Sequence, residues 1–321
     1  MKAAICTSYG KPEVLQLKNV EKPTPKDDQI LLKIYSSSVT SGDARIRRAD
    51  PYIIRLIFGF KRPRKSILGV VVAGEVESVG NNVSKFKVGD KVFGTTGMSF
   101  GAHAQYQCIS EEGTLAVIPE NMSYQAAAAI PFGGTAALHF LRKGEISKGQ
   151  KVLVFGASGA LGTAAIQLAK ERGAEVTAVC SGGNANLVSD LGADKVIDYT
   201  KTDFTQNGVK YDVIFDTVGK SSFSKGMKSL KKDGTMLLAS ASVGLMLRGA
   251  FSSMFGSKKV HSGVIKETAE DMRFFKELIE AGKLKAVVDK VYSLEEISLA
   301  HAHVDGGHKK GNVIISMNHA L

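Results

Sequence analysis

A turn of three glycines at three-residue spacing follows an apolar run in the stretch VLVFGASGALG, residues 152–162. The run before it is β-like, and the segment after it, TAAIQLAKERG, has the composition of a helix. Glycines at a strand-to-helix turn permit a tight bend, the approach of backbone N–H groups to a pyrophosphate, and close packing of helix on strand. The turn therefore predicts a dinucleotide site made by Gly156, Ala157, Ser158, Gly159, Ala160, Leu161 and Gly162. The alternative is a turn that needs glycine only for its shape.

The end of the next predicted strand indicates which dinucleotide binds. A carboxylate at that point would bond the ribose 2′-hydroxyl of NAD. Residues 180–184 read Cys-Ser-Gly-Gly-Asn instead, and small polar residues with backbone amides can accommodate a 2′-phosphate. We therefore expect NADPH, with NADH as the weaker alternative. No Arg or Lys stands in that loop, so the phosphate contacts are predicted to come from Ser181, Asn184 and Tyr199.

Six strand-like segments separated by helical stretches predict a doubly wound parallel sheet around the turn. They are residues 151–155, 175–180, 195–199, 211–216, 235–240 and 260–265. Sheets of this kind bind ligands at the carboxyl ends of their strands. The residues that close the fourth and fifth segments are therefore expected beside the nicotinamide: Thr217, Val218, Gly219, Ser240 and Ala241.

Length and composition restrict the class of protein. With 321 residues, 44% of them hydrophobic and 23% charged, the chain has room for two ordinary domains, and no apolar stretch is long enough to span a bilayer. The N-terminus lacks the sections of a signal peptide, so we expect a soluble, cytoplasmic protein. Cys6, Cys108 and Cys180 lie too far apart to suggest a disulfide framework or a zinc knuckle.

The net charge of +11 raises the question of an anionic partner. The basic runs at 45–48 and 61–65 carry no aromatic interleaving and belong to no nucleic-acid-binding motif. Nucleic acid is therefore not an expected partner, and a solvated, lysine-rich surface is the ordinary explanation of the charge.

These segments carry a family resemblance over nearly the whole chain. GQKVLVFGASGALGTAAIQLAK (149–170) resembles the signature of the zinc-independent medium-chain dehydrogenase/reductases of the quinone oxidoreductase type, departing at Ala160, where glycine is usual. Five further segments are similar in the same order: 68–80, 88–94, 187–200, 211–219 and 307–316. The resemblance implies an α/β protein in which a GroES-like, β-rich catalytic domain (1–123, completed by 283–321) contains an inserted Rossmann domain with a doubly wound parallel sheet (124–282). The cofactor would lie in the cleft.

The resemblance also implies site residues outside the turn. Tyr52 matches a position where relatives place a tyrosine near the substrate, and a tyrosine that packs a loop is the alternative. Thr40 stands where many relatives have asparagine. Ala136 replaces a frequent threonine, and the adjacent Thr135 is the candidate to substitute for it at the cofactor, although its side chain would point elsewhere on a helix. Lys310, Gly311 and Asn312 resemble a segment that approaches the cofactor, although Lys310 is equally consistent with a surface lysine.

Zinc alcohol dehydrogenases of the same superfamily polarise the substrate oxygen with a metal ion. Where their ligands stand, this chain has Ser-Val-Thr-Ser at 38–41 and Gly-Val-Val at 69–71, and valine cannot hold zinc. His301, His303 and His308 form the remaining cluster, but their spacing is poor for a shared ion. We predict no metal.

Hydride addition to a quinone or an α,β-unsaturated carbonyl needs only orientation and hydrogen bonding of a delocalised oxyanion. The sequence therefore predicts an NADPH-dependent, metal-free quinone or enone reductase. The alternatives are a non-catalytic NADPH-binding sensor or structural protein and, behind it, a zinc alcohol dehydrogenase. Residues 51–65 and 243–259 mix apolar side chains with cations, which suggests a weak peripheral membrane contact, an apolar pocket wall or a homodimer contact.

Overall fold

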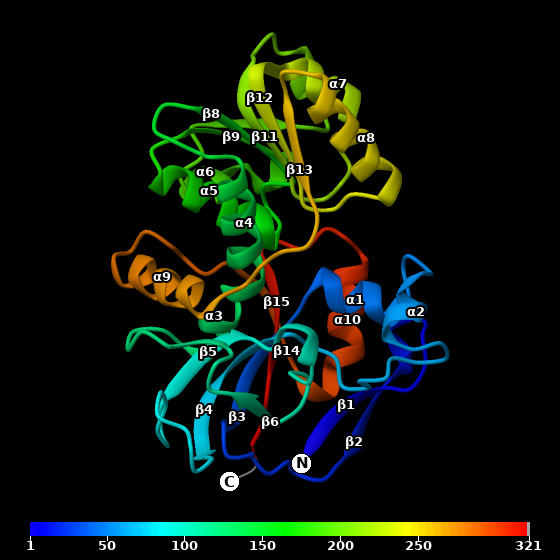
Figure 1. Cartoon of the computed structure of the whole chain (residues 1–321), viewed down its shortest axis with the longest axis vertical. Coiled ribbons are helices and arrows are strands. Elements are labelled where there is room, and N and C mark those ends of the chain that lie inside the picture. The colour runs from blue at the N-terminus through cyan, green and yellow to red at the C-terminus, as the bar shows by residue number, and fades with distance from the viewer. Residues whose placement is uncertain (320–321) are drawn as a thin grey trace. The chain divides into compact units, whose positions relative to one another are not determined.

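The computed structural model describes residues 1–319 and divides into two compact units, whose elements are labelled in Figure 1. Residues 1–132, 268–280 and from 286 onward form the first unit, and residues 133–267 and 281–285 form the second. This division differs from the expected domain boundaries chiefly at residues 124–132 and 268–280, which belong to the first unit. No helix within residues 1–319 is long and apolar enough to cross a bilayer.

The second unit contains the predicted parallel sheet. Its strands are β8 (Lys151–Phe155), β9 (Glu175–Cys180), β10 (Lys195–Asp198), β11 (Tyr211–Asp216), β12 (Leu230–Leu238) and β13 (Lys259–Ser262). They are hydrogen-bonded in the order β10-β9-β8-β11-β12-β13, and every neighbouring pair is parallel. The first strand of this sheet, β8, thus lies in its middle. Strands β9 and β10 are added on one side of β8, and strands β11, β12 and β13 on the other, which makes a topological switch point beside β8. The expected doubly wound sheet is confirmed.

Apolar runs buried on both faces explain why these segments form central strands. Val152, Leu153 and Val154 of β8 are fully buried, and so is Phe215 of β11, whose ring lies 5.5 Å from that of Phe140. The helices of this unit are α4 (Pro131–Lys143), α5 (Ala160–Glu171), α6 (Ala185–Asp190), α7 (Phe223–Ser229) and α8 (Val243–Phe255), with short 3-10 turns η3 (Gly182–Asn184) and η4 (Phe204–Gln206).

The first unit is β-rich, as expected. A seven-stranded sheet has the order β14-β15-β3-β4-β5-β7, with β6 also paired to β3, and β1 and β2 form a separate hairpin pair. The strands are β1 (Lys2–Cys6), β2 (Leu15–Asn19), β3 (Gln29–Val39), β4 (Val71–Val79), β5 (Lys91–Thr95), β6 (Tyr106–Ser110), β7 (Thr114–Val117), β14 (Val288–Ser293) and β15 (Asn312–Ser316). Because β15 pairs with β3, the last part of the chain completes the sheet begun by the first.

The helices of the first unit position the predicted substrate residues. They are α1 (Ser41–Arg48), α2 (Ile54–Phe58), α3 (Tyr124–Ala128), α9 (Ala269–Glu280) and α10 (Ile297–Asp305), with 3-10 turns η1 (Pro12–Val14), η2 (Gly97–Ser99) and η5 (Leu294–Glu296). Helix α1 follows Thr40, and Tyr52 lies between α1 and α2.

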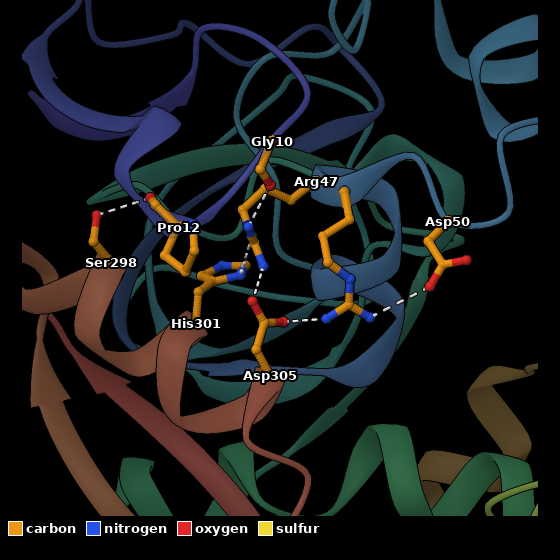
Figure 2. Close-up of polar contacts among 8 residues, drawn as sticks. Gly10, Pro12, Arg47, Asp50, Ser298, His301 and Asp305 are labelled. Atoms are coloured by element: carbon orange, nitrogen blue, oxygen red, sulfur yellow. Dashed lines mark hydrogen bonds and ion pairs between the residues drawn. The ribbon is translucent and has the colours of Figure 1, made fainter.

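A buried arginine ties α1 to α10 (Figure 2). Arg47 is fully buried; it donates from Nη1 to the Gly10 carbonyl at 2.5 Å and from Nε to His301 Nδ1 at 3.3 Å, and it forms an ion pair with Asp305. Arg48 shares Asp305 and also faces Asp50 at 3.8 Å. Burial, followed by the charges of His103, Arg47 and Arg48, holds the pKa of His301 well below its usual value, so its ring is neutral and can accept from Arg47. The ties fix the end of α1, from which the chain leads to Tyr52.

Candidate active site

The glycine turn separates two roles that glycine can play. Gly156 has φ +78°, and a Cβ there would lie 2.7 Å from Thr217 Oγ1. A Cβ on Gly162 would overlap the Gly156 carbonyl. These two positions therefore need glycine for the fold itself. Gly159 differs, because its φ is −79° and the nearest atom to an added Cβ is 3.6 Å away.

Gly159 is the N-cap of α5 and provides no side-chain cap. The first turn of a helix leaves backbone N–H groups without intrahelical partners and carries the positive end of the helix dipole. A side chain at 159 would project in front of these groups, and glycine leaves that space open. The open space before these N–H groups could take a pyrophosphate, so the roles expected of residues 156–162 stay a prediction.

Three small polar side chains meet beside this turn. Asn184 donates from Nδ2 to Ser158 Oγ at 3.0 Å and to Ser181 Oγ at 3.2 Å. The predicted phosphate residues Ser158, Ser181 and Asn184 are therefore brought together. Tyr199 joins them through its backbone, which donates to the Cys180 carbonyl at 3.1 Å, while its side chain is exposed.

A carboxylate that sequence reasoning missed lies against the same loop. Asp198 ends β10 and pairs in register with Cys180 of β9. A Cβ on Gly182 would lie 2.5 Å from Asp198 Oδ2. Hydrogen bonds from the Thr200 hydroxyl and the Thr200 amide, with a smaller contribution from the Gly182 backbone, lower the pKa of Asp198, so the group is ionised. The Asp-Tyr-Thr spacing is that of a local Asx-type turn, but only the strand register reveals which loop it faces.

Asp216, also missed, fixes the loop after β11. This buried carboxylate accepts from the amides of Val218 (3.0 Å), Gly219 (2.7 Å) and Ser221 (2.9 Å). Thr217 donates from Oγ1 to the Phe155 carbonyl at 2.8 Å. The predicted residues 217–219 are thus held rigidly at the carboxyl edge of the sheet, next to the end of β8.

The remaining predicted residues of the second unit, Ser240, Ala241 and Thr135, lie in different surroundings. The Ala239 amide donates to the Asp216 carbonyl at 3.0 Å, so Ser240 and Ala241 leave the sheet beside the 217–219 loop. Thr135 is buried in α4, where its hydroxyl bonds to Glu267 at 3.2 Å. That bond gives Thr135 a role in holding Glu267 to α4.

The two predicted catalytic residues lie in the first unit and differ sharply in environment. Tyr52 is 66% exposed, with the Arg55 guanidinium 4.7 Å from its ring centroid. Thr40 is buried and caps α1: its hydroxyl donates to Asp43 Oδ2 at 2.7 Å and accepts from the Asp43 amide at 3.1 Å. Asp43 also accepts from the Gly69 amide at 3.1 Å. Thr40 therefore has a structural task, whereas the Tyr52 hydroxyl is open to a ligand.

The 309–312 segment precedes and opens β15. Lys310 is exposed, whereas its neighbour Lys309 is half-buried and donates to the Gly311 carbonyl at 2.5 Å. Burial lowers the pKa of Lys309 to about 8, against the opposing effect of Asp289. Asn312 is buried, and both its amide and its side chain donate to the Val287 carbonyl, at 2.9 and 3.1 Å. Asn312 thus anchors the start of β15.

The donor atoms needed for a metal ion are not gathered in the described part of the chain. Residues 1–319 contain no group of three or more His, Cys, Asp and Glu side chains placed to share one ion. His301 is committed to Arg47, while His303 contacts Tyr292 Oη and Asp289, each at 2.9 Å. Val70 and Val71 offer only hydrocarbon. These residues do not fit a zinc centre.

An apolar cavity of about 180 Å³ lies within the first unit. Its lining comes from α1, α2, the loop after α2 and η2: Ile46, Ile57, Phe58, Pro63, Arg64, Lys65, Leu68, Met98 and Phe100. The cavity is large enough for a small apolar group.

Comparison with known proteins agrees with this geometry. Residues 26–120 match the family "Alcohol dehydrogenase GroES-like domain", and residues 191–315 match "Zinc-binding dehydrogenase". The chain is 32% identical to 2-methylene-furan-3-one reductase of Solanum lycopersicum and 31% identical to the chloroplastic NADPH-dependent alkenal/one oxidoreductase of Arabidopsis thaliana; each alignment covers 98% of this chain and 79% of the relative. The quinone oxidoreductase of Coxiella burnetii superposes with a TM-score of 0.90 at 26% identity, covering 99% of both chains.

The expected resemblance is confirmed by identity that extends over nearly the whole chain. The fold, a GroES-like unit with an inserted Rossmann sheet, is that of the solved relative. The chain belongs to the medium-chain dehydrogenase/reductase superfamily, as an NAD(P)H-dependent oxidoreductase of the quinone oxidoreductase type.

Proposed function

We propose that the protein is an NADPH-dependent reductase that transfers a hydride to a quinone or to the β-carbon of an α,β-unsaturated carbonyl compound, without zinc. The observation that carries the proposal is the turn at Gly159, where the absence of a side chain exposes the N-terminus of α5. The nicotinamide of a bound NADPH supplies the hydride. The chain's own residues bind the cofactor, orient the acceptor and stabilise the developing oxyanion.

The cofactor half of the proposal assigns the pyrophosphate to residues 156–162 and the 2′-phosphate to Ser181, Asn184 and Tyr199. Support comes from the hydrogen bonds of Asn184 to Ser181 and to Ser158 of the turn and from the Arabidopsis relative, whose name specifies NADPH. The fixed 217–219 loop and residues 240–241 are assigned to the nicotinamide side. The negative charge of Asp198 repels the 2′-phosphate, so we expect a moderate preference for NADPH over NADH.

The acceptor half rests on chemistry that requires no Lewis acid. Conjugate addition to an enone or a quinone spreads the developing charge over an oxygen and a π-system, so orientation and one hydrogen bond suffice. Tyr52, whose hydroxyl is exposed, is assigned to donate that bond. The apolar cavity in the first unit is assigned to the apolar part of the substrate. The names of the tomato and Coxiella relatives support these substrate classes.

Oxidation of NADPH, followed by its absorbance, tests the proposal with a simple quinone and an enal as acceptors after exhaustive chelation. We expect turnover that chelation does not reduce. Turnover that disappears on chelation and returns with zinc would contradict the metal-free mechanism. NADPH binding without turnover across the panel would favour the non-catalytic binder instead. The expected cytoplasmic location is a separate prediction, which a fluorescent fusion tests.

A further inference from the structure

The segment from Pro51 to Lys65, called here the α2 segment, exposes an unusual apolar face. Tyr52, Ile53, Leu56, Ile57 and Phe60 are each between 56% and 69% exposed. Single exposed apolar residues are ordinary, but a contiguous group of large ones marks an interaction surface. Met98, itself 65% exposed, adjoins the segment because its carbonyl accepts from Lys65 Nζ at 3.1 Å.

The spacing of these residues explains the face. Ile53, the N-cap of α2, and Leu56 and Ile57 within it follow the i, i+3, i+4 spacing that gathers side chains on one side of a helix, and Phe60 follows the helix after its C-cap Gly59. Ile54, on the other side, is buried, and the Phe58 ring packs edge-on against Phe100 at 5.7 Å. The helix is therefore held by its inner apolar side while presenting a second apolar side outward. Figure 1 draws α2 and the loop after it at the periphery of the first unit.

The segment is held in place by contacts that leave the outer face free. Tyr9 donates from its hydroxyl to the Gly59 carbonyl at 2.7 Å. The Arg55 guanidinium lies between two rings, 4.9 Å from the centroid of Tyr9 and 4.7 Å from that of Tyr52. The outward apolar side chains are thus presented by an anchored backbone.

Cations surround the apolar face without compensating carboxylates. The α2 segment contains Arg55, Lys61, Arg62, Arg64 and Lys65, and no Asp or Glu occurs from residue 51 to residue 74. Within residues 1–319 none of these five cations forms an ion pair. The face therefore combines hydrocarbon with a positive charge that nothing in the described chain neutralises.

This combination selects among possible occupants. A second copy docking by a two-fold axis would bring ten like charges together, since the same patch must meet itself. Nucleic acid would be matched by the cations and could stack on Tyr52 or Phe60, but the other three residues of the face, Ile53, Leu56 and Ile57, offer no stacking surface. An anionic bilayer matches both features, because its phosphates pair with Lys and Arg while its acyl boundary takes the apolar side chains.

We propose that the α2 segment docks the protein reversibly on anionic phospholipid membranes, with Ile53, Leu56, Ile57 and Phe60 at the boundary of headgroups and acyl chains. Arg62 and Arg64 are assigned to the lipid phosphates. The argument uses only the exposure and charge of this segment and does not rest on the proposed reaction.

The first experiment measures co-sedimentation with vesicles of phosphatidylcholine alone and of phosphatidylcholine mixed with phosphatidylserine. We expect binding to the mixed vesicles only, and its loss when salt rises to roughly 0.5 M. The double variant Arg62→Glu/Arg64→Glu should bind at least about tenfold more weakly, given the contribution of each basic residue at a lipid surface. Lys87→Glu/Lys148→Glu, which reverses two exposed charges elsewhere, is the matched control and should bind like the parent.

The second experiment uses the fact that the chain contains no tryptophan. A single tryptophan at Leu56→Trp should shift its emission to shorter wavelength on mixed vesicles and be quenched by brominated lipid. Val264→Trp, at a residue that is 93% exposed in the other unit, should do neither. Agreement of both reporters supports insertion of this particular face.

Three results would overturn the proposal. These are failure to bind mixed vesicles at low salt, equal weakening by both charge-reversal pairs, and a shift of the Leu56→Trp emission without vesicles that follows self-association. The last would assign the face to a second copy of the chain. NADPH oxidation by the parent protein with a water-soluble quinone, measured in parallel, keeps the two proposals distinct, because the parent can bind vesicles without turnover or turn over without binding vesicles.

Discussion

Asp198 and Gly182 face each other at the carboxyl edge of the second unit's sheet: a Cβ on Gly182 would lie 2.5 Å from Asp198 Oδ2, and Asp198, which accepts from the Thr200 amide and hydroxyl, has a lowered pKa. The loop proposed to hold the 2′-phosphate is therefore bordered by a negative charge. Asp198 belongs to β10 rather than to β9, the strand that usually carries the residue selecting the dinucleotide. Cofactor preference thus depends on two neighbouring strand ends.

Replacing Asp198→Asn should strengthen NADPH binding relative to NADH. The change removes a charge that repels the 2′-phosphate and keeps an acceptor for Thr200, so roughly a three- to tenfold change in the ratio of dissociation constants is expected. Fluorescence titration with both dinucleotides measures it. Asp190→Asn, an exposed change at the other end of α6, is the control. A shift toward NADH would mean that Asp198 interacts with the cofactor differently from this proposal.

Substitutions at the glycine turn should separate binding from folding. Gly159→Val is expected to abolish NADPH binding while leaving the melting temperature nearly unchanged, because its φ is ordinary and the site of the side chain is open. Gly162→Ala should lower the melting temperature, since its Cβ would overlap the Gly156 carbonyl, and overpacking of this kind costs about 1–3 kcal/mol. Dinucleotide titration and thermal unfolding of both variants provide the comparison. If Gly159→Val unfolds the protein and Gly162→Ala does not, the assigned roles are reversed.

Substitutions at the two predicted catalytic residues should have opposite effects: one should lower turnover, and the other should lower stability. Tyr52→Phe removes an exposed hydroxyl, so turnover with a quinone should fall without being lost and the melting temperature should not change. Thr40→Ala removes the side-chain cap of α1 and one of the three donors to Asp43, which should cost about 1 kcal/mol of unfolding free energy, and Thr40→Ser should restore it. Steady-state kinetics together with urea unfolding test the pair. Loss of turnover in Thr40→Ser at full stability would instead give the Thr40 methyl group a role in the reaction.

The sequence was sufficient for the parts of the fold that depend on local pattern. Apolar runs such as 151–155 are strands because both faces are buried, and the glycine turn predicted the helix after it. Strand ends were less predictable: β12 begins at Leu230, five residues before the expected start. Leu230 pairs with Tyr211 of β11, and the polar residues 231–234 lie in an irregularity before the pairing resumes at Thr235. Asp198 could not be placed at the cofactor loop because its position follows from β9–β10 register. Similarly, nothing in the Lys-Lys pair at 309–310 distinguishes the half-buried residue from the exposed one.

The half-buried Lys309 gives a pH dependence of stability with a defined sign. Burial lowers the pKa of Lys309 from 10.5 in a free side chain to about 8 in the folded protein. Below about pH 8 both states are protonated, and the folded state bears the full cost of a buried ammonium. Between that pH and 10.5 the unfolded chain binds more protons, so the unfolding free energy rises with pH. Lys309→Met removes this dependence: relative to the parent, it should be most stable near pH 7, and its advantage should shrink toward pH 10. Urea unfolding across this range measures the difference, with Lys310→Met, at the exposed neighbour, as the control. Parallel pH profiles for the parent and Lys309→Met would show that the lysine keeps its charge and its ordinary pKa in the folded protein.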